Sequence, residues 1–277
     1  MSARVAFQGE AGAYSDEAAR TILPGSRTTG YNTFAQAFAA LRRREADAAV
    51  LPVENSLAGI VQEVNDLLWE HRVLRVSGEH IHPVRHSLLG TGAGPIKRAI
   101  SHPQALAQCR KWLEANNVEP IPFHDTAGAA RHLAEVRTPG LGAIASRAAA
   151  SRYGLQMIAE GIQDDPSNRT RFIVVERGEP LRPESAGLAH KASLAFIAAH
   201  RPGSLVAALK CFGDRSVNLT RLDSRPLRDR PFEYLFHLDF EVGSPEVGGD
   251  ALAALESEAS EVRLFGTFPA ATSPEVG

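Results

Sequence analysis

The stretch DDPSNRTRFIVVE, residues 164–176, places a polar cluster directly in front of an apolar run. The run FIVV is typical of a buried strand, because β-branched and aromatic residues favour pleated, buried backbone. A strand that begins at Phe172 would hold Asn168, Thr170 and Arg171 at its edge. There an amide, a hydroxyl and a guanidinium could converge on one anion. The alternative is a polar turn with Arg171 in solvent, and the pattern leaves both open.

The segments before this strand predict a parallel α/β fold. Short apolar runs such as RVAFQG (4–9) and LGAIAS (141–146) alternate with helical patterns such as FAQAFAALRRR (34–44) and PQALAQCRKWLEA (103–115). This alternation is typical of strands joined by crossover helices. LRVSGEHIHPVRHSLLGTGAGP (74–95) holds two extended runs without a helix, so we expect the chain to pass there into a second lobe, at about residues 80–160. Ligands of open α/β lobes bind beyond the carboxyl ends of strands, so a cleft between the lobes is the expected site.

A second domain is expected after residue 180. RGEPLRPESAGLAH (177–190) carries two prolines and two glycines, a composition typical of a linker, which we place at 181–190. Residues 191–269 then show the order strand, helix, strand, strand, helix, strand. This βαββαβ order predicts a ferredoxin-like domain behind a two-lobed domain of residues 1–180.

Charge and composition exclude several classes of protein. Thirty Lys and Arg against 32 Asp and Glu give a net charge of −2, which offers no attraction to nucleic acid. No apolar run approaches the roughly 20 residues of a membrane helix. The N-terminal segment enters a strand without a secretory signal, and Cys109 and Cys211 lack zinc spacing. We therefore expect a cytoplasmic protein without a nucleic-acid or membrane partner.

Polar side chains occupy five loops, each of which is expected to follow a strand and open a helix. Such side chains most often cap the helix, yet helix N-termini also bind carboxylates. Five loops of this kind would suit a ligand with more than one negative charge. The candidate residues are Tyr14, Ser15, Glu54, Asn55, Ser56, His102, Gln104, Thr126 and Ser146.

Competing motifs are weak. GTGAG (90–94) lacks the GxGxxG spacing of a dinucleotide loop. His80 and His82 fall on one strand face and could form a metal pair, but no third ligand has a clear place. We expect neither a metal ion nor an organic cofactor.

Several motifs, taken in chain order, resemble a known family. FQGEAGAYS (7–15), PVENS (52–56), SHPQALAQC (101–109) and NRTRF (168–172) resemble prephenate dehydratase. RPGSLVAAL (201–209) and NLTRLDSRP (218–226) resemble the ACT regulatory domain of that family. The resemblance covers nearly the whole chain.

The resemblance implies a catalytic domain like a type II periplasmic binding protein, which converts prephenate to phenylpyruvate, with loss of carbon dioxide and water, in phenylalanine biosynthesis. The essential threonine of the family falls on Thr170. Because a hydroxyl is a weak acid, we expect Thr170 to donate a hydrogen bond to the departing oxygen rather than to act as a strong acid. Asn168, Arg171, Phe172 and the loop residues above would bind the dianionic substrate.

The resemblance also implies feedback by L-phenylalanine, bound between the ACT domains of a homodimer or homotetramer. Two motifs depart from the usual family pattern: DSRP (223–226) stands for ESRP, and GSLV (203–206) for GALV. Feedback is expected to persist, since both changes are chemically conservative. The residues implied for the effector site are Gly203, Ser204, Leu205, Asn218, Leu219, Asp223, Ser224 and Arg225.

Two alternatives remain open. Arogenate dehydratase differs by accepting an amino group where prephenate has a keto group. A non-catalytic amino-acid sensor would need only a binding cleft, and the intact NRTRF motif counts against it.

Overall fold

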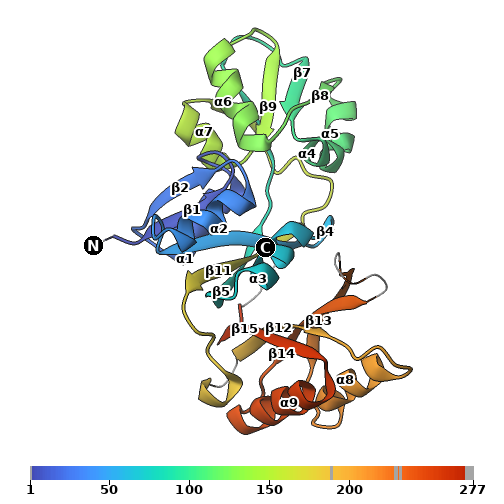
Figure 1. Ribbon diagram of the computed structural model, residues 1–277. Coiled ribbons are helices and arrows are strands. Elements are labelled where there is room, and N and C mark those ends of the chain that lie inside the picture. Colours follow the sequence, from blue (N-terminus) through green and yellow to red (C-terminus); the bar gives the residue numbers. More distant parts are fainter. Residues whose placement is uncertain (1, 188–189, 228–229, 231–232, 272–277) are drawn as a thin grey trace. The chain divides into compact units, whose positions relative to one another are not determined.

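The computed structural model describes residues 2–187, 190–227, 230 and 233–271 (Figure 1). Residues 188–189 of the predicted linker, and residues 228–229 and 231–232 of the predicted ACT domain, lie outside the described residues. The chain divides into two compact units. The first unit holds residues 1–61 and 80–172, and the second holds residues 62–79 and 173–272.

The first lobe is built on a sheet with the strand order β2-β1-β3-β11-β5, to which β4 adds by pairing with β3. β1 runs parallel to both β2 and β3. Helices α1 and α2 pack against this sheet. The elements are β1 (Arg4–Gln8), α1 (Tyr14–Ile22), β2 (Arg27–Tyr31), α2 (Phe34–Arg42), β3 (Ala48–Asn55), β4 (Gly59–Ile60), β5 (Leu74–Pro83) and β11 (Arg169–Arg177).

The second lobe has the strand order β10-β6-β9-β7-β8. Successive strand residues point to opposite faces, so Leu88 and Leu89 enter separate cores on the two sides of the sheet. The two-lobed α/β fold predicted from the alternation is confirmed. The elements are β6 (Ser87–Gly90), β7 (Arg98–Ser101), α4 (Pro103–Gln108), α5 (Arg110–Ala115), β8 (Glu119–Pro122), α6 (Thr126–Val136), β9 (Leu141–Ala145), α7 (Arg147–Tyr153) and β10 (Gln156–Glu160).

The predicted helix at 103–115 is instead two short helices that meet at Cys109. Asp164 is the cause. Its backbone N–H donates to the Gln108 carbonyl at 2.6 Å, and its carboxylate accepts from the Lys111 N–H at 3.2 Å. In a continuous helix the Gln108 carbonyl and the Lys111 N–H would each bond within the helix. Here both bond to Asp164, which lies in the loop that precedes Thr170.

Two further predictions at the site are wrong in detail. β11 begins at Arg169 rather than Phe172, because the Ser56 N–H donates to the Arg169 carbonyl at 2.9 Å and the Arg169 N–H donates to Ser56 Oγ at 3.0 Å. The PVENS loop does not open a helix. It leads into the β3–β4 hairpin, where Gly59 adopts φ +84°, and α3 (Gln62–Glu70) begins only afterwards.

The second unit contains the predicted βαββαβ order, with the antiparallel strand order β13-β14-β12-β15. Helices α8 and α9 cover one face of this sheet (Figure 1). Phe196, Phe212, Phe240 and Leu252 are fully buried between the sheet and the helices. The elements are η1 (Pro183–Ser185), β12 (His190–Ile197), α8 (Ser204–Gly213), β13 (Leu219–Pro226), β14 (Tyr234–Glu241), α9 (Pro245–Glu258) and β15 (Glu261–Pro269).

The second unit also includes α3 and the start of β5, which sequence analysis placed in the first domain. The Arg263 guanidinium, 7% exposed, donates to the carbonyls of Leu68, Trp69, His71 and Leu74, at 2.6 Å for His71. These carbonyls lie at and beyond the C-terminal end of α3, where a helix has no internal partners for them. One arginine of β15 therefore closes the end of α3.

Further contacts hold the same segment. Lys191 Nζ lies 3.2 Å from the nearly inaccessible Glu79 carboxylate. A side chain at Gly266 would come within 2.1 Å of the Val76 carbonyl, so only glycine allows this approach of β15. The Arg225 guanidinium pairs with Asp66 at 2.5 Å and also contacts Gln62.

Candidate active site

A cavity of about 510 Å³ lies within the first unit, a size typical of small-molecule sites. Both lobes contribute to it. The first lobe supplies Gln8, Tyr14, Ser15, Pro52, Asn55, Ala58, Gly59, Ile60, Val61, Asn168, Thr170 and Phe172. The crossover and the second lobe supply Val84, His86, His102, Gln104, Ala105, Gln108, Asp125 and Thr126.

Most of the predicted substrate residues meet at this cavity, although they are spread over more than 150 positions of the chain. Four predicted residues lie outside its lining: Glu54, Ser56, Ser146 and Arg171. The lining residues predicted from sequence are Tyr14, Ser15, Asn55, His102, Gln104, Thr126, Asn168, Thr170 and Phe172.

Ser146 is an N-cap. Its hydroxyl accepts from the Ala149 N–H at 3.1 Å and donates to the Gly12 carbonyl at 2.7 Å, and the side chain is 2% exposed. The hydroxyl is thereby used in capping α7 and in joining the two lobes. Ser56 is likewise engaged with the backbone of Arg169.

Arg171 lies between two lining residues of β11, Thr170 and Phe172, so strand alternation directs its side chain to the opposite face of the sheet. Its Nε is 3.6 Å from Glu54 Oε2. Carboxylate binding by Arg171 stays a prediction, and this placement does not favour it.

Thr170 is held by a network of amides. Asn55 Nδ2 lies 2.9 Å from Thr170 Oγ1, 2.9 Å from Asn168 Oδ1 and 3.0 Å from the Arg169 carbonyl. Asn168 is fully buried, and its Nδ2 has no hydrogen-bond partner among the described residues. A buried donor without a protein partner is available to a ligand.

His86, which sequence analysis did not select, belongs to the same cavity. Its Nε2 lies 2.9 Å from Gln108 Oε1 and its Nδ1 lies 2.9 Å from the Tyr14 hydroxyl. The Tyr14 hydroxyl also donates to the Arg85 carbonyl at 2.8 Å, so its one proton is used there and its oxygen is what contacts His86 Nδ1. Burial lowers the pKa of His86 and raises the pKa of Tyr14 well above its usual value. Both groups are therefore neutral near pH 7.

The cavity has donors but no cation. None of the described residues that line it is lysine or arginine. Helices α1 and α6 begin at its wall with Tyr14 and Thr126, and α1 has no side-chain cap, so its first-turn N–H groups are available to a negative group. Asp125, which caps α6 through the Gly128 N–H, adds a carboxylate to the same wall.

Sequence analysis expected no metal site and no membrane span. No group of three His, Cys, Asp or Glu side chains in this part of the chain could hold a metal ion. Within the same residues, no helix is long and apolar enough to cross a membrane.

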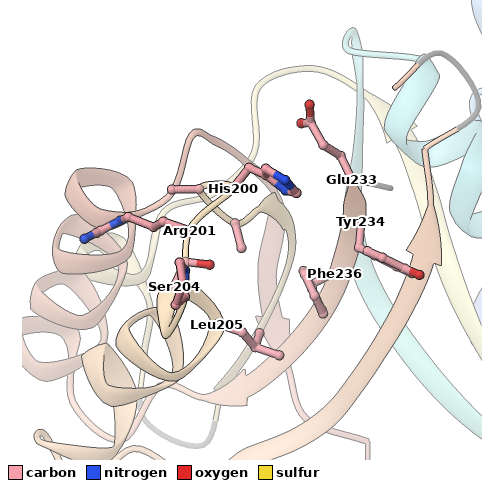
Figure 2. A pocket seen from close by; sticks show the side chains of 10 residues that line it. His200, Arg201, Ser204, Leu205, Glu233, Tyr234 and Phe236 are labelled. Atoms are coloured by element: carbon pink, nitrogen blue, oxygen red, sulfur yellow. The ribbon is translucent and has the colours of Figure 1, made fainter. Parts of the chain in front are cut away.

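A smaller pocket of about 290 Å³ lies in the second unit, at the N-terminal end of α8. Figure 2 shows Leu205 and Phe236 near one end and His200 and Glu233 near the other. Of the predicted effector residues, Ser204 and Leu205 line it, and Gly203 begins the helix with φ +81°. The remaining five, Asn218, Leu219, Asp223, Ser224 and Arg225, lie on or beside β13 and outside this pocket.

Comparisons with known proteins give one family model and several similar proteins. Residues 5–180 match the family described as prephenate dehydratase. Arogenate dehydratase/prephenate dehydratase 2, chloroplastic, from Arabidopsis thaliana is 41% identical, over 98% of this chain and 74% of the relative. A prephenate dehydratase from Arthrobacter aurescens, solved in complex with L-Phe, is 32% identical with a TM-score of 0.87, over 96% of this chain and 90% of that one. A structure described as GqqA, a novel type of quorum quenching acylase, is 36% identical with a TM-score of 0.89, over 96% and 98% of the two chains.

Proposed function

The chain belongs to the prephenate dehydratase family, an enzyme family of the lyase class, and we propose that it converts prephenate to phenylpyruvate. The observation that carries the proposal is the Thr170 hydroxyl, which lines the cavity and accepts from Asn55. A hydroxyl that accepts from the protein keeps its own proton for a ligand.

The chemistry needs little more than this donor. The bond between the ring and its carboxylate breaks to release carbon dioxide, and that electron pair enters the ring. The ring C–O bond then breaks, and its electron pair leaves with hydroxide. The dianion thus gives carbon dioxide, hydroxide and the phenylpyruvate monoanion. Formation of the aromatic ring drives the reaction, and Thr170 stabilises the charge that develops on the departing oxygen.

Neutral donors are proposed to hold the two carboxylates. The donors are the first-turn N–H groups of α1, Asn168 Nδ2, which has no hydrogen-bond partner among the described residues, and the Gln104 side chain. Preorganised donors of this kind bind anions well where water is excluded.

A second candidate substrate is arogenate. Asp125 is a carboxylate in the cavity wall, and it would attract the ammonium group that arogenate carries in place of the keto group. The plant relatives named arogenate dehydratase agree with this option. Hydrolysis by an acylase mechanism is disfavoured. Among the described cavity residues, the hydroxyl that contacts a histidine is that of Tyr14, whose raised pKa makes it a poor nucleophile.

One assay separates these functions. The purified protein is incubated with prephenate, with arogenate and with an acylated amine, and phenylpyruvate, phenylalanine and free amine are followed. We expect turnover of prephenate at the highest kcat/KM. A higher kcat/KM for arogenate would show that the protein is an arogenate dehydratase. Turnover of the acylated amine alone would refute both dehydratase functions. The sequence prediction of a cytoplasmic enzyme is kept in the proposal, although the Arabidopsis relative is named chloroplastic.

L-Phenylalanine is proposed as the feedback effector, bound at the pocket of Ser204 and Leu205. Support comes from the relative solved with L-Phe. Leu205 and Phe236 offer an apolar end for a ring, while His200 and Glu233 offer polar groups for the amino-acid end. β13 is an edge strand with Leu222 exposed, and Tyr234 on the adjacent β14 is also exposed. An unpaired edge with exposed apolar residues suits pairing with a second copy, which would bring a second β13 to the effector.

The route from effector to cavity is proposed to run through α3. Arg225 of β13 holds Asp66 and Gln62 at the start of this helix. The residues that directly precede the helix, Ala58 to Val61, line the catalytic cavity. An effector that moves β13 can therefore pull on the cavity wall, provided that it binds one arrangement more tightly.

The variant Arg225→Gln tests this route. It removes the charge that holds Asp66, and we expect the L-phenylalanine concentration for half inhibition to rise about 5- to 150-fold, the usual span of allosteric coupling. Arg215→Gln is the matched control, because Arg215 is exposed and its guanidinium donates to the Cys211 carbonyl of α8 rather than to a residue of α3. Equal inhibition of Arg225→Gln and wild type would contradict the α3 route.

A further inference from the structure

The side chain of Asn55 has a fixed orientation at the end of β3. Its Oδ1 accepts from the N–H groups of Leu57 at 3.1 Å and Ala58 at 2.9 Å, which forms the turn into β4. Two N–H donors on one side require the oxygen there, so the amide cannot be flipped. The Nδ2 group must therefore face the opposite side, towards β11.

On that side Nδ2 meets only acceptors. They are Thr170 Oγ1 at 2.9 Å, Asn168 Oδ1 at 2.9 Å and the Arg169 carbonyl at 3.0 Å. An amide nitrogen has no acceptor capacity, so the Thr170 hydroxyl cannot donate to Asn55. Within the described residues, the Thr170 hydroxyl accepts its hydrogen bond from Asn55.

We propose that Asn55 is a positioning residue, which does not bind substrate but fixes the direction of the Thr170 O–H bond. Asn55 donates to one lone pair of the Thr170 oxygen, and this contact limits the rotation of the hydroxyl. The Thr170 proton can then point into the cavity. Prior orientation of a donor removes the cost of turning it during the reaction. The inference rests on the proposed role of Thr170, and it replaces the predicted substrate contact of Asn55.

Asn55→Asp reverses the polarity of this contact while keeping the shape of the side chain. The aspartate still accepts from the turn N–H groups, but it cannot donate to Thr170, and its carboxylate instead attracts the Thr170 proton away from the cavity. We expect kcat to fall about 10- to 100-fold, the size of effect that misplacement of a reacting group produces, with a smaller change in KM.

Asn55→Ser serves as a second variant in case the aspartate prevents folding, since its shorter hydroxyl can keep the turn but cannot bridge to Thr170. Asn116→Asp is the matched control. It loses an amide bond to the Trp112 carbonyl at the exposed end of α5, and it does not line the cavity. Activity of each variant is scaled to the folded fraction measured by circular dichroism.

A double-mutant cycle with Thr170→Ala gives the decisive result. If Asn55 acts through Thr170, then Asn55→Asp costs nothing further once Thr170 is alanine. The inference would be overturned if the double variant lost activity by the product of the two single losses. It would also be overturned if Asn55→Asp kept the wild-type kcat or changed KM alone. None of these results would affect the role of Thr170. Wild-type turnover by Thr170→Ala itself would instead overturn the proposed function.

Discussion

The catalytic cavity of the first unit and the face of the second unit that receives α3 use charge in opposite ways. The substrate proposed for the cavity is a dianion, yet no arginine or lysine is among its described lining residues. The second face holds Arg263 on backbone carbonyls, Arg225 on Asp66, and the fully buried Asp239. In this protein buried charge joins segments of the chain, and neutral donors carry the proposed chemistry.

The largest expected effect tests the neutral half of this comparison. Thr170→Ala should lower kcat about 10²- to 10⁴-fold, because it removes the donor to the departing oxygen, with a smaller change in KM. Thr170→Ser should keep part of the rate. Steady-state kinetics with prephenate measure both. An alanine variant as fast as wild type would show that the catalytic donor is elsewhere.

The charged half is tested by Arg263→Leu. It removes the buried guanidinium that donates to the carbonyls of Leu68, Trp69, His71 and Leu74, so we expect a loss of about 3 to 5 kcal/mol in the free energy of unfolding. Thermal and urea denaturation measure this loss. Arg72→Leu is the control, because its ion pair with Glu261 is largely exposed and should be worth less than about 1 kcal/mol. If both variants lost the same free energy of unfolding, the contacts of Arg263 with these carbonyls would not be important for stability.

A smaller and pH-dependent effect is expected from His237. Burial, with Arg221 nearby, lowers its pKa to about 3, and Asp239 only partly opposes this shift. The unfolded chain binds this proton near pH 6.5, so stability is complete above that pH and falls as the pH decreases towards 3. One such group costs up to about 2 kcal/mol between pH 7 and pH 5. His237→Phe should therefore flatten the acid side of the melting-temperature curve, and an unchanged curve would exclude this group.

The smallest effect is expected at Arg171, where the sequence prediction and the structure diverge most. Arg171 lies on the face of β11 opposite Thr170 and near Glu54, so Arg171→Lys should change KM and kcat by less than about fivefold, the upper range for a partly exposed pair. Anchoring of a carboxylate by a bidentate guanidinium would give a larger rise in KM. Kinetics of this one variant decide between the two.

The sequence was sufficient for the two-lobed α/β fold, for the βαββαβ order and for nine of the residues that line the cavity. Asn55 and Thr126 could be found because each lies in a polar loop expected to follow a strand, and Thr170 because it precedes the apolar run FIVV in the NRTRF motif. Arg171 was chosen for its charge, whereas strand alternation from the unrecognised start of β11 at Arg169 would have turned it away.

The remaining features depend on contacts distant in sequence. The break at Cys109 comes from Asp164, and the early β11 start comes from Ser56, neither of which leaves a local pattern. His86 could have been noticed as the third histidine of HIHPVRH, but only the Tyr14 and Gln108 contacts identify its place. The place of α3 in the second unit could not be predicted, because it depends on contacts with Arg263, which lies almost 200 residues away in sequence.

The discontinuous second unit has a consequence for the protein as it leaves the ribosome. α3 and the start of β5 are synthesised by Glu79, but the β15 strand that receives them ends at Pro269, 269 − 79 = 190 residues later. At about 5 to 20 residues per second, these segments wait roughly 10 to 40 s for their partner. During that interval Arg263 is not yet present to bind the carbonyls at the end of α3. These carbonyls, and the side chains of Leu67 and Leu68 that are buried in the folded protein, contact only water or a chaperone. A nascent chain arrested before β15 should therefore be open to proteolysis near α3, even where the second lobe, residues 87–160, has already folded.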